Sequence, residues 1–321
     1  MLSSLSNISD KVNGPILLIS AVSVFLLITL TLAMIYFVIR YSRKRNPVAS
    51  ETHGHMALEV AWTIIPTLIA FGFFWYGWVG YKFMKSPPED AMVVEVTGRM
   101  WSWSHEYANG VVTPELNIPV NQAVRLNLTS VDVLHSYYIP AFKIKQDAVP
   151  GVDGLFLWFE AYEEGTYHVF CTEYCGLNHS YMLTKVHVLS QAEFDAWYAE
   201  EGEKVAATEA ALEGEGGEVS PEALVAAGKQ LATTKGCVAC HSVDGTPLVG
   251  PSFKGLFGKT ETVTTGGAPR QITVDEDYIR KSIVDPMADI TEGFQPLMPS
   301  QQGLMTDDEI NAVIEYIKTI H

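Results

Sequence analysis

The chain has 321 residues, of which 48% are hydrophobic and 18% are charged, and its formal net charge is −16. This length predicts two or three domains, and the high apolar fraction excludes a disordered or fibrous chain. The acidic balance excludes nucleic acid as a partner, because phosphate binding requires a clustered basic surface. Four cysteines are too few for a disulfide scaffold, and they form two close pairs, which is typical of metal, redox or haem chemistry.

Two uncharged segments near the start of the sequence predict membrane-spanning helices. The first is expected over about residues 15–40 and the second over about 58–82. Each is long enough to cross a bilayer core of roughly 30 Å. The loop between them is basic, so the positive-inside rule places it in the cytoplasm and both flanks outside the cytoplasm. Its cationic residues are Arg40, Arg43, Lys44 and Arg45.

A cleaved signal peptide is the alternative for the first apolar segment. It fits poorly, because the apolar run is too long and the positive charges follow the run instead of preceding it. We therefore expect residues 1–90 to form a retained anchor with two transmembrane helices.

Residues 91–190 predict a cupredoxin-like β-domain. Short runs of alternating apolar and polar residues are separated by turn residues, which is typical of an antiparallel sandwich or barrel. Residues 191–221 are strongly acidic and contain several glycines near their end. We expect this linker to be solvated and self-repelling, and partly helical at its start.

Residues 222–321 predict a small all-α domain. Its first helix is expected to begin after Ser220, with a proline at the first helical position. Thr273 and Thr306 are each followed three residues later by glutamate, which is the spacing of a capping box. The last predicted helix presents one apolar face formed by Ile310, Val313, Ile314 and Ile317.

Cys237, Cys240 and His241 form a Cys-x-x-Cys-His motif after a predicted helix. This arrangement lets two thioether bonds attach a haem while the histidine binds the iron. A zinc site would need a second cysteine pair downstream, and a thioredoxin-like site would need a βαβ context. The sequence predicts neither, so we expect a covalently bound haem c.

A methionine is the expected sixth ligand of this haem iron, because a thioether raises the haem potential. Met298 is favoured, since its irregular proline- and glutamine-rich stretch precedes the last helix and can reach back over the haem. Met287 and Met305 border predicted helices and are expected to be packing residues.

A second cluster of soft ligands follows the strand predicted at residues 166–170 and consists of Cys171, Cys175, His179 and Met182. Their spacing could also place them on one face of a helix, but a glycine within the segment and the β-branched strand before it argue against a helix. These ligand types suit copper. His135 lies upstream, and one upstream histidine with a Cys/His/Met loop is typical of a blue-copper site.

Cys175 does not fit this blue-copper pattern, which holds a single metal ion. Two thiolates can bridge two metals, with each metal completed by one histidine and weaker axial ligands. A dinuclear copper centre therefore uses every soft ligand present, whereas a mononuclear centre leaves Cys175 unused. Because a charge shared over two coppers changes the geometry little, electron relay is the expected use of such a site.

In these motifs the chain resembles subunit II of cytochrome c oxidases, in the form with a cytochrome c fused to its C-terminus. The resemblance covers essentially the whole chain. The segments that carry it are Leu58–Pro66, Trp101–Trp103, Asp132–Ser136, the Cys171–Met182 loop and, for a class I cytochrome c, Gly250–Gly258 together with the haem motif.

The resemblance implies roles for individual residues. The ligands of a dinuclear CuA centre would be His135, Cys171, Cys175, His179, Met182 and the backbone carbonyl of Glu173. The Glu173 carboxylate would reach a magnesium site shared with subunit I. Trp101 would receive electrons near CuA, and Glu59 would be the acid at the cytoplasmic mouth of a proton channel in subunit I. Simple packing of Trp101 and simple solvation of Glu59 are the alternatives.

The implied function is electron input to a terminal respiratory oxidase that reduces oxygen to water and translocates protons. Electrons would pass from haem c to CuA and on to subunit I, because the oxygen-reducing site is not on this chain. The expected partners are oxidase subunits I and III, an upstream cytochrome or quinol-oxidising complex, and membrane lipid. The expected location is the bacterial cytoplasmic membrane, with the copper and haem domains on the periplasmic side.

Two other functions stay open at this point. The same electron-accepting role could feed nitric oxide reduction, because the acceptor chemistry lies off this chain. A membrane-tethered copper-binding or redox-sensing protein is the second alternative, although ligands drawn from two distant segments suit copper delivery poorly.

Overall fold

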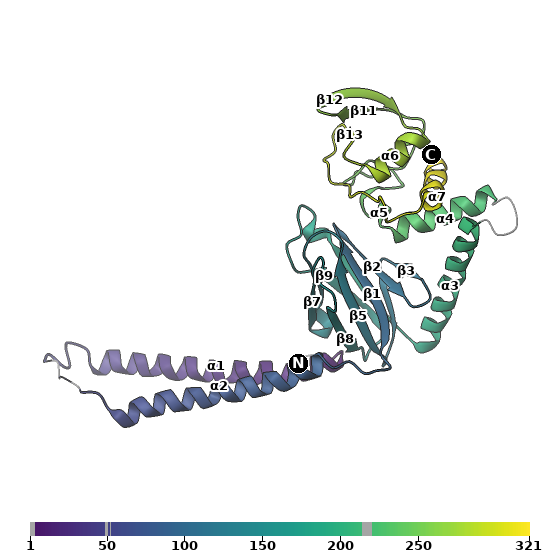
Figure 1. Ribbon diagram of the computed structural model, residues 1–321. Helices are drawn as coiled ribbons and strands as arrows, with labels where there is room; N and C mark the ends of the chain where they lie inside the picture. The colour runs from purple at the N-terminus through teal and green to yellow at the C-terminus, as the bar shows by residue number, and fades with distance from the viewer. Residues whose placement is uncertain (1–3, 49–50, 52, 214–219) are drawn as a thin grey trace.

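The structure is a computed structural model that describes residues 4–48, 51, 53–213 and 220–321. Along the chain it consists of a helical hairpin, a β-sandwich, a connecting helix and a second, mainly helical domain (Figure 1). The hairpin meets one end of the sandwich, and the helical domain lies at the other end (Figure 1). Two separate hydrophobic clusters form the cores of the sandwich and of the helical domain.

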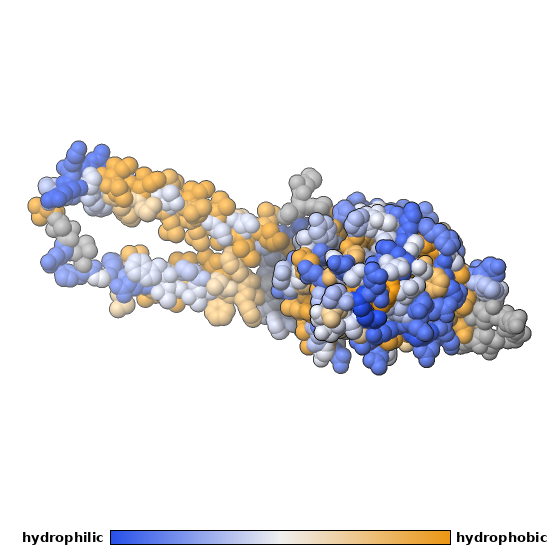
Figure 2. Space-filling view, turned by 90° about the horizontal axis from the view of Figure 1, so that it is seen from above, coloured by the Kyte–Doolittle hydropathy of each residue, from blue (hydrophilic) through white to orange (hydrophobic). Residues whose placement is uncertain are grey.

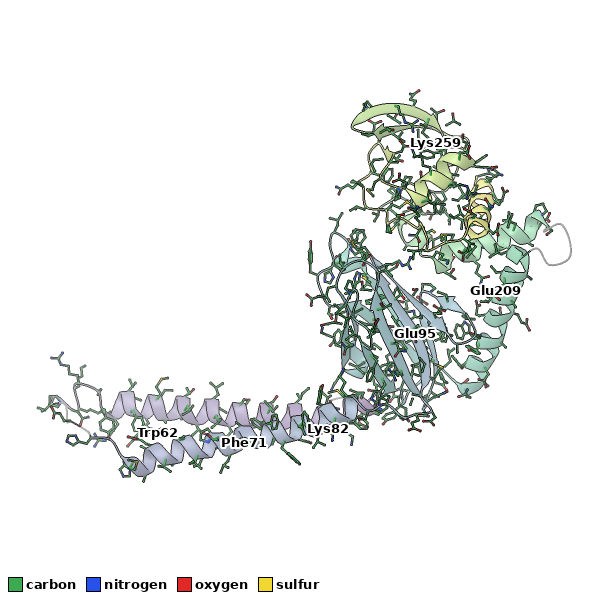
Figure 3. All side chains as sticks on the ribbon, in the orientation of Figure 1. Trp62, Phe71, Lys82, Glu95, Glu209 and Lys259 are labelled. Atoms are coloured by element: carbon green, nitrogen blue, oxygen red, sulfur yellow. The ribbon has the colours of Figure 1, made fainter. Side chains whose placement is uncertain are left out.

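The hairpin is formed by α1 (Asn7–Arg40) and α2 (Met56–Met84), and both helices are longer than the sequence predicts. Both are long and apolar enough to cross a membrane. Their surface is hydrophobic along the length of the hairpin and hydrophilic at its far tip (Figure 2). Along α2, Trp62 and Phe71 lie on the hairpin and Lys82 lies near the sandwich (Figure 3).

The sandwich consists of two five-stranded sheets, with the orders β3-β2-β1-β5-β8 and β4-β10-β9-β6-β7. In chain order its strands are β1 (Met92–Arg99), β2 (Ser102–Tyr107), β3 (Val112–Thr113), β4 (Leu116–Pro119), β5 (Ala123–Ser130), β6 (His135–Ile139), β7 (Ile144–Ala148), β8 (Phe156–Glu160), β9 (Gly165–Cys171) and β10 (Leu183–Leu189). Two short 3-10 turns, Pro140–Phe142 and His179–Tyr181, interrupt the connections.

The expected sandwich is confirmed, and most of its strand pairs are antiparallel. Two pairs are parallel, however: β1 with β5 and β4 with β10. A parallel pair needs a long crossover, and the chain between β1 and β5 does cross to the other sheet at β4. The predicted alternation holds within the strands, since every second residue of β1 and β5 is buried between the sheets.

The start of α1 is built into the sandwich. Ser6 forms a β-bridge with Ala161 and donates a side-chain hydrogen bond to the carbonyl of Phe142 at 3.1 Å. The Asn7 side chain accepts the Glu160 amide at 3.0 Å, and Ile8 is completely buried. Removal of this segment with a signal peptide would expose the base of the sandwich, so these contacts favour a retained first helix.

The acidic connection is a continuous helix, α3 (Gln191–Glu213). The helix expected at the start of the linker therefore extends much further, and the expectation of a solvated, self-repelling spacer is corrected. Near its beginning, Phe194 is buried in the sandwich core and Trp197 packs edge-on against Tyr107 at 5.2 Å. Further along, Thr208 donates to the Gln230 side chain of the helical domain at 2.6 Å. The apolar face was hidden in the sequence by the acidic residues around it, such as Glu209 (Figure 3). The glycine-rich end of the expected linker, at 214–219, lies outside the described residues.

The helical domain contains α4 (Pro221–Thr234), α5 (Cys237–Cys240), α6 (Glu276–Val284) and α7 (Asp307–Lys318). The predicted cap of α4 by Ser220 and the Thr306 capping box of α7 are confirmed. The predicted capping box at Thr273 is wrong, because Thr273 ends a strand and Asp275 caps α6 instead. The predicted apolar face of α7 is buried.

A small sheet also belongs to this domain, which is helical as expected but not all-α. It consists of β11 (Thr260–Thr265), β12 (Ala268–Thr273) and β13 (Ile290–Thr291), in the order β12-β11-β13. The threonine-rich β11 has β-branched side chains, and the two glycines that follow it form the two-residue turn of a hairpin.

Replacement of Ile8 by alanine should destabilise the sandwich, because Ile8 is a completely buried side chain of its core. We expect a loss of about 2–5 kcal/mol in the free energy of unfolding. Denaturant unfolding of the detergent-solubilised chain, followed by near-UV circular dichroism, measures it. Leu17→Ala on the exposed face of α1 is the control. Equal effects of the two variants would contradict the built-in start of α1.

Candidate copper and haem sites

The candidate copper site lies at one end of the second sheet, where β6 begins and β9 ends. His135 is the first residue of β6, and Cys171 is the last residue of β9. The two strands pair antiparallel, with Tyr137 opposite Cys171, so the residues meet at the same end of the sheet. The loop after β9 then returns to this end with Cys175, His179 and Met182 before β10 begins. All five soft ligands predicted from the sequence are thus brought together.

The two cysteine sulfurs are the centre of the site and lie 3.7 Å apart. The His135 Nδ1 atom lies 3.9 Å from the Cys171 sulfur, and the His179 Nδ1 atom lies 3.4 Å from the Cys175 sulfur. Each sulfur therefore has its own histidine. With the zinc–thiolate length of about 2.3 Å as a guide, one metal can contact both sulfurs at this separation.

Two weaker donors complete the cluster. The Met182 sulfur lies 3.8 Å from the Cys175 sulfur, and the backbone carbonyl of Glu173 lies 3.3 Å from the Cys171 sulfur. The donor set thus has one histidine and one weak ligand near each thiol. This arrangement fits two soft metal ions held by bridging thiolates better than a single ion.

Burial and mutual contact shift the pKa values of these groups in opposite directions. Burial favours the neutral thiol of Cys171, but the hydrogen bond with His135 and the backbone contacts outweigh it and lower the pKa of Cys171. Burial and the neighbouring Cys171 raise the pKa of Cys175. One thiol is therefore readily ionised, and the second proton is expected to leave when a metal binds.

Asp132 supports the site from behind His135, a role that the sequence analysis did not assign. The His135 Nε2–H donates to the Asp132 carboxylate at 2.8 Å, which leaves Nδ1 directed at the sulfurs. The same carboxylate accepts the Met100 amide at 2.6 Å. A carboxylate behind a ligating histidine fixes its tautomer and orientation. The spacing of Asp132 and His135 in the sequence was the available signal.

The candidate haem site lies in the helical domain around the Cys237–Cys240 helix. Cys237, Cys240, His241 and Met298 all line one mostly apolar cavity. The His241 Nδ1–H donates to the Pro251 carbonyl at 2.7 Å, and its ring stacks on Phe253 with centroids 4.8 Å apart. These contacts fix the ring and leave its other nitrogen for a metal.

The backbone of Gly250 packs closely against the ring of His241. A Cβ atom at this position would lie 2.5 Å from the His241 ring carbon Cε1, so any side chain would displace the ring. The donor set and the apolar walls therefore fit a haem with a histidine ligand. Met287 and Met305 also line the cavity, and Met305 packs in the core as expected whereas Met287 is half exposed.

Trp101 belongs to both sites. Its indole Nε1–H donates to the backbone carbonyl of Cys175 at 3.0 Å. Together with Arg99, Met100 and Ser102, it also forms the wall that the sandwich contributes to the haem cavity. Trp103, which alternates with Trp101, is buried edge-on against the ring of His135. The structure thus gives the two tryptophans different surroundings.

Glu59 lies far from both metal sites. It is an exposed residue in the first turn of α2, at the tip of the hairpin away from the sandwich. Its carboxylate lies against Gly54, where a Cβ atom would be 2.8 Å from Oε1.

Family comparisons agree with this division of the chain. The model for the transmembrane domain of cytochrome c oxidase subunit II matches residues 6–74, and the model for its periplasmic domain matches residues 111–189. The cytochrome c model matches residues 225–321. Cytochrome c oxidase subunit 2 of Cereibacter sphaeroides is 31% identical over 57% of this chain and 72% of its own length. The chain belongs to the cytochrome c oxidase subunit II family.

Other relatives extend this comparison. Subunit 2 of Alkalihalophilus pseudofirmus is 28% identical over 94% of this chain and 86% of its own length. The crystal structure of the periplasmic domain of subunit II from Bradyrhizobium japonicum is 31% identical, with a TM-score of 0.35, and the match covers 37% of this chain and 99% of that domain. As a subunit II, the chain is part of a haem–copper oxidase, and its two extramembrane domains imply CuA copper and haem.

Replacement of Asp132 by asparagine should weaken copper binding by subunit II. The variant loses the negative charge that orients His135, and such partners typically change metal affinity by about 10–100-fold. Competition with a copper chelator measures the change. Asp153→Asn removes an exposed carboxylate elsewhere in the domain and is the matched control. Identical copper retention in both variants would refute the role of Asp132.

Proposed function

We propose that this subunit II accepts electrons at a covalently bound haem c and passes them to a dinuclear CuA centre. From there the electrons would pass to subunit I, which reduces oxygen to water and translocates protons. One observation carries the proposal: the Trp101 ring lines the haem cavity and donates a hydrogen bond to the Cys175 carbonyl. A single side chain therefore bridges the two candidate redox sites.

The proposed residue roles follow from the contacts in the two sites. The haem would be attached to Cys237 and Cys240, and His241 and Met298 would bind its iron. The copper ligands would be His135, Cys171, Cys175, His179, Met182 and the Glu173 carbonyl. Haem and CuA each supply one-electron redox chemistry when they are bound.

The burial of the copper ligands supports relay over copper delivery. The Cys171 and Cys175 residues are only 7% and 3% exposed, and Met182 is completely buried. Delivery requires exchangeable ligands at the surface, whereas a rigid, closed donor set keeps its geometry when the charge changes. The support from Asp132 adds to this rigidity.

The proposed location follows from the hairpin. Both helix ends next to the sandwich lie on one side of the membrane, and the basic loop lies at the opposite tip. The positive-inside rule then assigns the copper and haem domains to the periplasm of a bacterial cytoplasmic membrane. The proposed division of the chain is 1–90 for the anchor, 91–190 for the copper domain, 191–221 for the connection and 222–321 for the haem domain.

Proposed partners follow from the position of this subunit in an oxidase. Subunit I would receive the electrons, and subunit III would complete the assembly. An upstream cytochrome or quinol-oxidising complex would donate electrons to the haem. The Glu173 carboxylate is half-buried in the copper loop, where it could contribute to a magnesium site shared with subunit I. Glu59, at the opposite tip, would serve a proton channel in subunit I.

Replacement of Cys175 by serine tests the copper centre. The variant loses one bridging thiolate, so we expect it to lose the dinuclear copper spectrum while its haem stays attached. Copper analysis and electron paramagnetic resonance measure the first effect, and haem absorbance measures the second. Ser180→Ala, an exposed change in the same loop, should leave both unchanged. Normal copper content and an unchanged spectrum in Cys175→Ser would refute the assignment.

Replacement of Met298 by alanine tests the proposed methionine ligand of the haem iron. Loss of a thioether ligand should lower the haem reduction potential and change the oxidised spectrum. Met287→Ala alters another methionine of the same cavity and should do neither. A redox titration of both variants measures the two reduction potentials. A lowered potential in Met287→Ala with an unchanged potential in Met298→Ala would assign the ligand to Met287.

A further inference from the structure

We propose that Arg99 is a positioning residue that docks the haem domain on the copper domain. This inference rests on the proposed transfer of electrons from haem c to CuA. Arg99 is the last residue of β1 and lines the sandwich side of the haem cavity. Its guanidinium Nη1 donates a hydrogen bond across the domain boundary to the Lys235 carbonyl at 3.1 Å.

The Lys235 carbonyl is a favourable partner for a cation. Lys235 is the C-cap of α4, and the last carbonyls of a helix have no partner within the helix. The helix dipole also places partial negative charge at this end. A guanidinium that reaches this carbonyl therefore satisfies an acceptor and complements the dipole in one contact.

The positive charge of Lys235 does not oppose this contact. Its ammonium group turns into the haem domain and forms an ion pair with Glu309 at 3.0 Å. The same glutamate completes the capping box of α7 through the Thr306 amide. The haem domain thus pairs the lysine internally and presents its backbone carbonyl to Arg99.

Gly236 shows that the two domains approach closely at this point. Its backbone has a φ of +79°, which favours glycine. A Cβ atom there would lie 3.4 Å from the Ser102 hydroxyl and 3.7 Å from the Arg99 side chain. The copper domain therefore contacts the turn that leads directly into the haem-binding helix.

The position of this contact in the chain couples it to both redox sites. Arg99 precedes Trp101 by two residues, and Lys235 precedes Cys237 by two residues. The Arg99–Lys235 contact therefore sets the distance between the haem cavity and the tryptophan that contacts the copper loop. Since α3 also packs on both domains, loss of the contact should loosen this docking while the domains stay connected.

The test is the rate of electron transfer within the full chain in the purified oxidase. A photoactivated reductant injects one electron into haem c, and absorbance follows haem reoxidation and CuA reduction. In Arg99→Gln we expect the rate to fall about tenfold, the change that corresponds to the loss of about 1.4 kcal/mol of docking energy. Arg99→Lys keeps the charge at the helix end and should recover part of the rate.

Arg125→Gln is the matched control, because Arg125 lies on β5 of the same sheet and contacts Phe156 instead of the haem domain. Its rate should equal that of the wild type. Unaltered haem and copper spectra in the Arg99 variants show that the two sites are intact. If the spectra of Arg99→Gln are altered, the rate measured for Arg99→Lys is the test instead. Rates equal to the wild type in both would overturn the docking role. A wild-type chain without transfer from haem to copper would instead overturn the proposed function.

Discussion

The hydrogen bond from the Trp101 indole to the Cys175 carbonyl is the contact on which the arrangement of this subunit depends. It places an aromatic ring against the copper loop, and the same ring also lines the haem cavity. The haem domain supplies the rest of this cavity and lies over the same end of the sandwich (Figure 1). The α3 helix and the contact between Arg99 and Lys235 hold the domain there.

The copper ligands are positioned by strand pairing. The pairing of β6 with β9 brings His135 and Cys171 to the same end of the sheet, although they are far apart in the sequence. The loop to β10 supplies the other ligands, and Asp132 orients His135 from outside the cluster. At the other end of the sandwich, the buried start of α1 joins the copper domain to the hairpin. The copper site is thus held at a defined position relative to the two helices.

Much of this organisation could be predicted from the sequence, because the signals were local. The apolar segments gave the hairpin, strand alternation gave the sandwich, and the spacing of the cysteines gave both candidate metal sites. Contacts between distant residues were beyond reach: neither the buried Ile8 nor the Arg99–Lys235 hydrogen bond has a local pattern. The α3 helix was misjudged because its net charge concealed a packing face that includes Phe194 and Trp197. The hairpin of β11 and β12 was missed because helical signals flank it.

The most direct test of the account is the metal content of the full chain, purified without the other oxidase subunits from cells that attach haem c. Copper and iron analysis gives the stoichiometry, and electron paramagnetic resonance shows how the unpaired electron is distributed. The account predicts two coppers per haem iron, with one electron shared over both copper nuclei. One copper per iron with a localised signal would contradict it, because Cys175 would then have no role as a bridging ligand.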